Sequence, residues 1–97
     1  MKILISQIEY VRPPRNFVFD ALERVYYDFL AGHELVVAPN SNKVAHNDYD
    51  CLVLTGGPDS VSRNSTENLL YADAIKKGKP VVGICHGAFA INDICKG

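Results

Sequence analysis

The sequence predicts a three-layer α/β/α domain built on a mostly parallel sheet. Apolar runs of strand length alternate with longer segments whose apolar residues recur at helical spacing. Glycines and prolines separate the two kinds of segment. Length and composition agree with this class, because 97 residues with 47% hydrophobic and 22% charged residues suit one small globular domain.

Four apolar segments are expected to form the strands of this sheet. They comprise residues 2–7, 35–37, 50–55 and 81–84. The first is almost continuously apolar rather than alternating, which is typical of a strand covered on both of its faces. We therefore expect helices on both sides of the sheet.

The first helix is expected between the first two of these strands. Residues 9–15 should form a loop, because Pro13 and Pro14 cannot continue the interior of a strand. Asn16 is then a suitable N-cap, and apolar residues recur at helical spacing up to Leu30. Gly32 should end this helix.

Two more helices are expected in the second half of the chain. Asn64 is a suitable N-cap for one of them, with Glu67 three residues later as its capping-box partner. Gly78 should end that helix. The other is expected over residues 86–95, directly after the last strand.

The junction between the last strand and the last helix carries the strongest functional signal. An apolar strand that meets Gly83-Ile84-Cys85-His86-Gly87 and continues as a helix has the pattern of a nucleophile elbow, with Cys85 in the place where many hydrolases carry Ser. The positive end of the helix favours a thiolate there, and the His86 N–H would face a developing oxyanion. The alternative is a buried structural cysteine in an ordinary turn.

A second glycine-containing segment, Gly56-Gly57-Pro58, follows the third expected strand. Ligand sites in open α/β sheets lie beyond the carboxyl ends of the strands, so this segment and the elbow should meet at one edge. An acyl-transfer site needs a second N–H donor from a neighbouring loop, and Gly57 is expected to provide it. Gly56 and Pro58 are expected to contact the substrate.

Composition argues against several other classes of protein. A net charge of −1 without a basic block disfavours nucleic-acid binding, and no apolar run approaches the roughly 18 residues of a membrane-spanning helix. Cys51, Cys85 and Cys95 lack C-x-x-C spacing, which disfavours disulfides or zinc and favours a reducing, cytoplasmic compartment. No metal or organic cofactor is expected, and His33 and His46 are expected to be surface residues.

The chain resembles the N-terminal half of a class I glutamine amidotransferase domain, in its opening strand and in LTGGPDS and GKPVVGICHGAF. Arg63 and Glu67 resemble its gamma-glutamyl hydrolase-like branch. The resemblance implies a flavodoxin-like fold and hydrolysis of glutamine or another gamma-glutamyl amide through a thioester on Cys85. It also implies that the N–H groups of Gly57 and His86 hold the oxyanion. In amidotransferases the ammonia passes to a synthase partner, whereas in the hydrolases the amine is released.

Two features depart from the family pattern. Phe89 occupies the position where the family commonly has a substrate-contacting Gln, which implies a changed specificity or a different gamma-glutamyl amide. The His and Glu of the family's triad lie downstream of the elbow. Residues 1–97 are therefore expected to be a half domain, inactive and unstable or self-associated alone, whose other half comes from a longer parent or a second polypeptide.

Two other interpretations of the sequence remain. One is a non-catalytic relic or binding module with the same fold, which Phe89 and the absent triad residues favour. The other is a different α/β protein with an elbow, such as a cysteine hydrolase of the related peptidase-like families or a flavodoxin-like binder.

Overall fold

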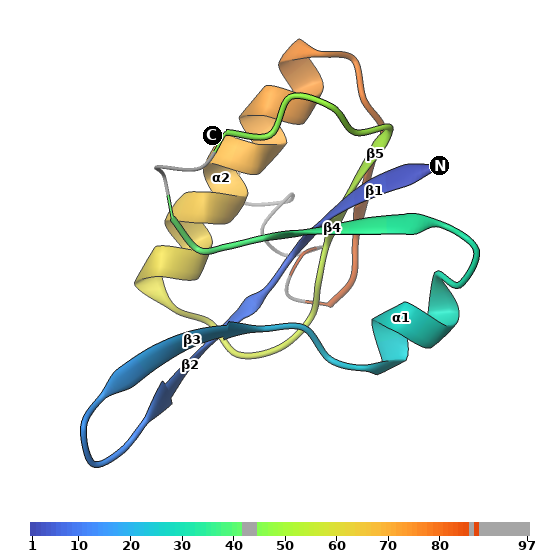
Figure 1. Ribbon diagram of the computed structural model, residues 1–97. Coiled ribbons are helices and arrows are strands. Elements are labelled where there is room, and N and C mark those ends of the chain that lie inside the picture. The colour runs from blue at the N-terminus through green and yellow to red at the C-terminus, as the bar shows by residue number, and fades with distance from the viewer. Residues whose placement is uncertain (42–44, 86, 88–97) are drawn as a thin grey trace.

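The computed structural model describes residues 1–41, 45–85 and 87, and four of its strands form a parallel sheet. These strands are β1 (Lys2–Ser6), β4 (Glu34–Ala38), β5 (Cys51–Leu54) and β6 (Val81–Gly83). Their order across the sheet is β4-β1-β5-β6, with β1 and β5 in the middle (Figure 1). All neighbouring strands run parallel, which confirms the predicted fold class.

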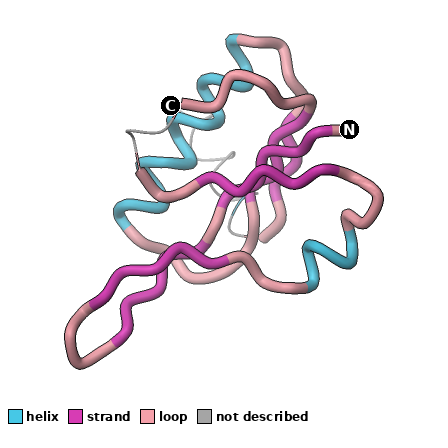
Figure 2. Tube along the Cα trace, in the orientation of Figure 1, coloured by secondary structure: helices cyan, strands magenta, loops and turns pink. Residues whose placement is uncertain are grey.

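Two helices, α1 (Val25–Phe29) and α2 (Val61–Lys76), lie on opposite faces of this sheet (Figure 2). Leu70 of α2 packs in one core cluster that includes Leu4 and Leu52. Tyr26 of α1 packs in the other, which includes Ile5. Because successive residues of a strand point to opposite faces, the continuous apolar runs are explained by a core on each side.

A β-hairpin formed by β2 (Ile8–Arg12) and β3 (Phe17–Ala21) projects from the body of the protein (Figure 1). The sequence prediction of a loop over 9–15 and a helix from Asn16 to Leu30 is therefore wrong. Phe17-Val18-Phe19 are aromatic and β-branched residues, which suit a strand and pair here with residues 10–12. Asn16 lies in the turn at φ 54°, and helix remains only over residues 25–29.

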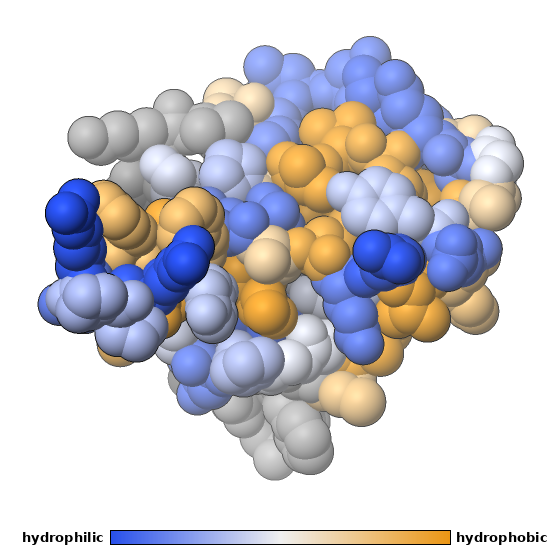
Figure 3. All heavy atoms as spheres, turned by 60° about the horizontal axis from the view of Figure 1, so that its bottom comes forward, coloured by the Kyte–Doolittle hydropathy of each residue, from blue (hydrophilic) through white to orange (hydrophobic). Residues whose placement is uncertain are grey.

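Large apolar side chains are exposed on both faces of this hairpin. They are Tyr10, Val11, Phe17, Val18 and Phe19, each 46–62% exposed. The face turned forward in Figure 3 accordingly mixes apolar with hydrophilic surface. The base of the hairpin is held to the body, because Asn40 donates hydrogen bonds of 3.1 and 2.8 Å to the Asp20 carboxylate.

The second helix begins four residues earlier than predicted. Its N-cap is Ser60, whose hydroxyl accepts a 3.1 Å hydrogen bond from the Arg63 N–H. Asn64 is therefore inside the helix, and Glu67 is a buried ion-pair partner rather than part of a capping box. Gly78 ends this segment as predicted, in the left-handed conformation at φ 68°.

The strands are close to their predicted bounds, and their carboxyl ends meet at one edge of the sheet. At this edge the Ser6 hydroxyl accepts a 2.9 Å hydrogen bond from the Thr55 N–H, which joins the ends of β1 and β5. The helix expected over 86–95 falls outside the described residues, except for Gly87. No helix within the described ranges is long and apolar enough to cross a membrane.

Candidate functional site

Cys85 lies two residues beyond β6, at the carboxyl edge of the sheet, and its side chain is exposed. The alternative of a buried structural cysteine is therefore wrong. The backbone of Cys85 is left-handed, with φ 50°, a conformation that non-glycine residues rarely adopt outside tight turns and functional sites. The Gly87 N–H donates to the Ile84 carbonyl at 3.0 Å and closes the turn around the thiol.

Gly87 is the glycine that brings this turn against the sheet. A Cβ placed on it would lie 2.1 Å from the backbone oxygen of Leu54 in β5, which is far inside van der Waals contact. The same oxygen accepts a 2.9 Å hydrogen bond from the Ile84 N–H. The absence of a Cβ at Gly87 therefore allows the turn to pack directly against the backbone of β5.

The glycine loop, defined as Gly56-Gly57-Pro58, lies directly beside Cys85. A Cβ on Gly56 would approach the Cys85 Cβ to 3.3 Å. Gly57 has φ 119°, and a Cβ there would lie 2.6 Å from the Ile8 side chain. The fold thus brings together the two segments that the sequence predicted to meet. In the chain, 27 residues lie between Gly57 and Cys85, and they include α2 and β6.

Arg63 of α2 fixes the far side of the glycine loop. Its side chain is fully buried and forms a 2.8 Å ion pair with Glu67, which is also fully buried. One terminal nitrogen donates to the carbonyls of Gly56 and Pro58 at 3.3 and 3.1 Å. The other donates to the carbonyl of Thr55 and, at 3.0 Å, to its hydroxyl. Glu67 was expected to be a capping-box partner, and Arg63 entered only through the family resemblance, so this contact was not predicted. Their spacing of four residues was the available signal.

Tyr26 reaches the same loop from the opposite face of the sheet. Its hydroxyl accepts a 3.1 Å hydrogen bond from the Gly56 N–H, and its side chain is almost entirely buried. Nothing in the sequence distinguishes Tyr26 from its exposed neighbour Tyr27, because the contact depends on how α1 packs on the sheet. The loop is consequently held by hydrogen bonds from both sides.

A cavity of about 250 Å³ opens beside the glycine loop. Its walls come from the hairpin, from α1 and from the loop itself, and comprise Ile8, Ala21, Leu22, Glu23, Tyr26, Thr55, Gly56, Gly57 and Pro58. Most of these side chains are apolar, and Glu23 supplies the one carboxylate. A small, largely apolar pocket with a single charged group is typical of sites for small ligands.

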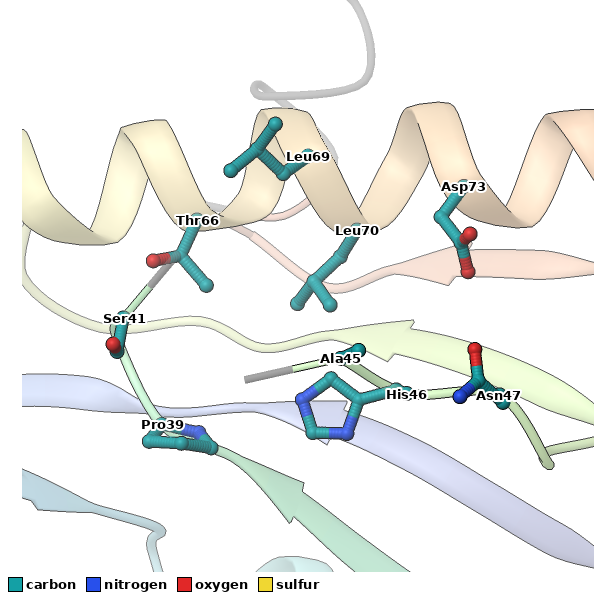
Figure 4. Close-up of a pocket in the computed structure, with 9 residues that line it drawn as sticks. All are labelled: Pro39, Ser41, Ala45, His46, Asn47, Thr66, Leu69, Leu70 and Asp73. Carbon is teal, nitrogen blue, oxygen red and sulfur yellow. The ribbon is translucent and has the colours of Figure 1, made fainter. Parts of the chain in front are cut away.

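A second cavity, of about 240 Å³, lies between α2 and the loop after β4 (Figure 4). His46 and Asp73 face it from opposite sides, but neither the glycine loop nor Cys85 lines it. The Asp73 carboxylate accepts a 2.7 Å hydrogen bond from Tyr49 and pairs with Lys77 at 2.9 Å. The Asp73 carboxylate is thus already engaged, and its bond with Tyr49 holds α2 to the body of the protein.

Burial and neighbouring charges shift the pKa values of several groups in and near the second cavity. Burial lowers the pKa of His46, against a weaker opposing effect of Asp73. The hydrogen bond from Lys77 lowers the pKa of Asp73, whereas burial and Asp73 together raise the pKa of Tyr49. Burial and the neighbouring Asp50 raise the pKa of the Cys51 thiol, which is the opposite of what a nucleophile needs.

Neither of the two described histidines lies at the strand end that carries Cys85. His33 precedes β4, and the His46 carbonyl accepts a hydrogen bond from Lys77, at the end of α2 that leads into β6. His33 therefore lies at the amino ends of the strands, whereas Cys85 follows a carboxyl end, and His46 faces the second cavity, which Cys85 does not line. Neither is positioned as its base. His86 and Phe89, also selected from sequence, lie outside the described residues.

Within the described ranges, no group of three His, Cys, Asp or Glu side chains is arranged to hold a metal ion. The candidate site comprises Cys85 and the glycine loop beside it, and the loop in turn borders the cavity of about 250 Å³, which Cys85 itself does not line. Its possible chemistry is nucleophilic attack by sulfur on an electrophilic carbon, with stabilisation of an oxyanion by N–H groups.

Comparison with known families agrees with this arrangement. The family model described as DJ-1/PfpI matches residues 18–94. The chain belongs to the DJ-1/PfpI family. This family is part of the class I glutamine amidotransferase-like superfamily, so the resemblance is confirmed at the level of the superfamily. This superfamily uses a Cys nucleophile, and its members include amidases, proteases and chaperones. Searches of curated proteins and of solved structures found no match.

The DJ-1/PfpI match includes the glycine loop, Arg63 and Cys85, and it omits β1 and β2. It does not confirm the gamma-glutamyl hydrolase-like branch that Arg63 and Glu67 suggested. Of the interpretations left open by the sequence, it is compatible with an amide hydrolase and with a member of the related peptidase-like families. It is also compatible with a non-catalytic binding module, because the superfamily has chaperone members.

Proposed function

We propose that this protein is a cysteine-dependent hydrolase of carboxylic amides, with Cys85 as its nucleophile. The observation that supports this most directly is the placement of an exposed thiol, on a left-handed backbone, in contact with a glycine loop that also borders a small pocket. A binding module with the same fold would not require the strained backbone at Cys85.

In the proposed reaction the Cys85 thiolate adds to the amide carbonyl carbon and forms a C–S bond. The negative charge on the carbonyl oxygen is held by the Gly57 N–H and, as the sequence predicts, by that of His86. The C–N bond then breaks as the leaving amine takes up a proton. Water attacks the resulting thioester, releases the carboxylic acid and restores the thiol.

The leaving amine takes its proton from a general acid, which is the protonated form of the base that first deprotonates Cys85. Neither His33 nor His46 lies beside Cys85 to serve in this role. We assign it to a residue outside the described part of the chain, on the same protein or on a second polypeptide. The half-domain organisation expected from the sequence is retained here as part of the proposal.

We assign glutamine or another gamma-glutamyl amide as the substrate class. The likeness of LTGGPDS and GKPVVGICHGAF to class I glutamine amidotransferases supports this assignment. The pocket of about 250 Å³ has room for a small amide, and Glu23 in its wall can pair with the α-ammonium group of a glutamyl substrate. Phe89 in place of the usual Gln favours a glutamyl amide other than glutamine, so Phe89→Gln should improve glutamine use.

The proposal is tested by labelling with a glutamine-analogue chloroketone, followed by peptide mass spectrometry. We expect modification of Cys85 and not of Cys51, which is buried and has a raised pKa. Glutamine and gamma-glutamyl anilides are then assayed for release of ammonia or aniline, with Cys85→Ala as the control. Equal labelling of both thiols, or unchanged hydrolysis by Cys85→Ala, would refute the assignment.

A further inference from the structure

The ion pair between Arg63 and Glu67 is unusual for its complete burial, since neither side chain has any exposed surface. Removing two charges from water is costly, and a pair of apolar residues of similar size is often at least as stable. The pair therefore needs an explanation other than stability. Its position between α2 and the glycine loop provides one.

All three guanidinium nitrogens of Arg63 donate to acceptors in the structure. Nε donates to Glu67, and the two terminal nitrogens donate to the stretch from Thr55 to Pro58. The backbone carbonyls of residues 55, 56 and 58 thus converge on one cation. A lysine could not hold this set, because its single ammonium lacks the planar fork of five N–H donors.

Convergence of these carbonyls sets the direction of the Gly57 N–H. In a planar trans peptide the C=O and the following N–H point in opposite directions. Because the Gly56 carbonyl points to Arg63, the Gly57 N–H must point away from it, and this N–H has no hydrogen-bond partner among the described residues. A peptide rotated the other way would present a carbonyl oxygen, which repels an oxyanion.

We infer that Arg63 is a positioning residue that holds the Gly56–Gly57 peptide with its N–H directed to the substrate carbonyl beside Cys85. This inference rests on the proposed acyl transfer. Arg63 acts through the loop and does not touch the substrate. Glu67 acts one step further out, because it fixes the guanidinium through Nε. Tyr26 holds the preceding N–H from the other side of the loop.

Two reactions of the Cys85 thiol should respond differently to the loss of Arg63. Alkylation of Cys85 by iodoacetamide displaces iodide and builds no oxyanion, whereas acylation by p-nitrophenyl acetate does. For Arg63→Lys we expect an acylation rate lowered by about 100-fold, as for loss of one oxyanion donor, with KM little changed. The alkylation rate should stay within about twofold of the unmodified protein, because it depends on the thiolate and its access.

A double variant, Arg63→Met with Glu67→Leu, guards against a folding defect. It replaces the buried pair with apolar residues of similar size and frees the loop carbonyls. We expect it to unfold cooperatively in urea, to alkylate at a near-normal rate and to acylate slowly. Asn68→Ala, on the exposed side of the same helix, is the matched control and should leave both rates unchanged.

The outcomes distinguish the inference from the function on which it rests. Acylation that persists in a folded Arg63 variant, or a parallel loss of acylation and alkylation, would overturn the positioning role while leaving the hydrolase proposal intact. These assays use the protein together with the polypeptide or segment that supplies the proton-transferring residue. If Cys85 then alkylates but the protein neither acylates nor hydrolyses any gamma-glutamyl amide, both proposals are overturned.

Discussion

Replacing Gly87 with alanine should strongly destabilise the protein and disturb the turn at Cys85. The new Cβ would lie 2.1 Å from the Leu54 oxygen, 2.6 Å from its carbonyl carbon and 2.7 Å from its Cβ. Ordinary contact begins near 3.4 Å, so the turn and β5 must separate by roughly 1.3 Å. Leu54 is fully buried in the core and cannot retreat.

The expected cost has two parts. Forcing an extra carbon into a packed region costs about 1–3 kcal/mol. The displaced Leu54 oxygen also loses its hydrogen bond from Ile84, which adds about 0.5–1.5 kcal/mol. We therefore expect the free energy of unfolding to fall by about 1.5–4.5 kcal/mol, which is a large share of the roughly 5–15 kcal/mol typical of a domain.

Urea unfolding followed by circular dichroism measures this change, with Gly78→Ala as the matched control. Gly78 has φ 68° but no atom near its Cβ position, so alanine there meets only backbone strain of about 1 kcal/mol. The rate of Cys85 alkylation in the native protein reports on the turn itself. Equal destabilisation by the two substitutions, with unchanged alkylation, would refute the steric account of the turn.

Three further predictions concern the framework of the site. Ser60→Ala should lower the free energy of unfolding in urea by about 1 kcal/mol through loss of the cap, whereas Asn64→Ala should not. Tyr26→Phe should cost about 1–2 kcal/mol in the same assay, because a loop N–H loses its acceptor; an unchanged midpoint would contradict that bond. Lys77 lowers the pKa of Asp73 in the folded state. The stability from Asp73, about 0.5 kcal/mol for a partly exposed pair, should be present above about pH 4 and lost as pH falls through its folded pKa. Asp73→Asn should therefore destabilise at pH 7 and not at pH 2, and an equal effect at both would exclude the ion pair.

The hairpin shows where local pattern was insufficient. Apolar residues from Phe17 to Leu30 recur at a spacing that fits a helix, but residues 17–19 also have high strand propensity. Pairing with residues 8–12 decided between the two, and that pairing depends on a segment on the other side of two prolines. The periodicity of a short segment does not include the energy of pairing with a strand outside that segment.

The sequence by itself determined the parallel sheet, its two-sided core and the two segments at its carboxyl edge. These follow from continuous apolar runs and from glycines at positions where a Cβ has no room, as at Gly87. Only the tertiary structure decided what holds the glycine loop. The bonds from Arg63 and Tyr26 join a helix, a loop and the opposite face of the sheet, and no local propensity encodes contacts that exist only once three layers have packed.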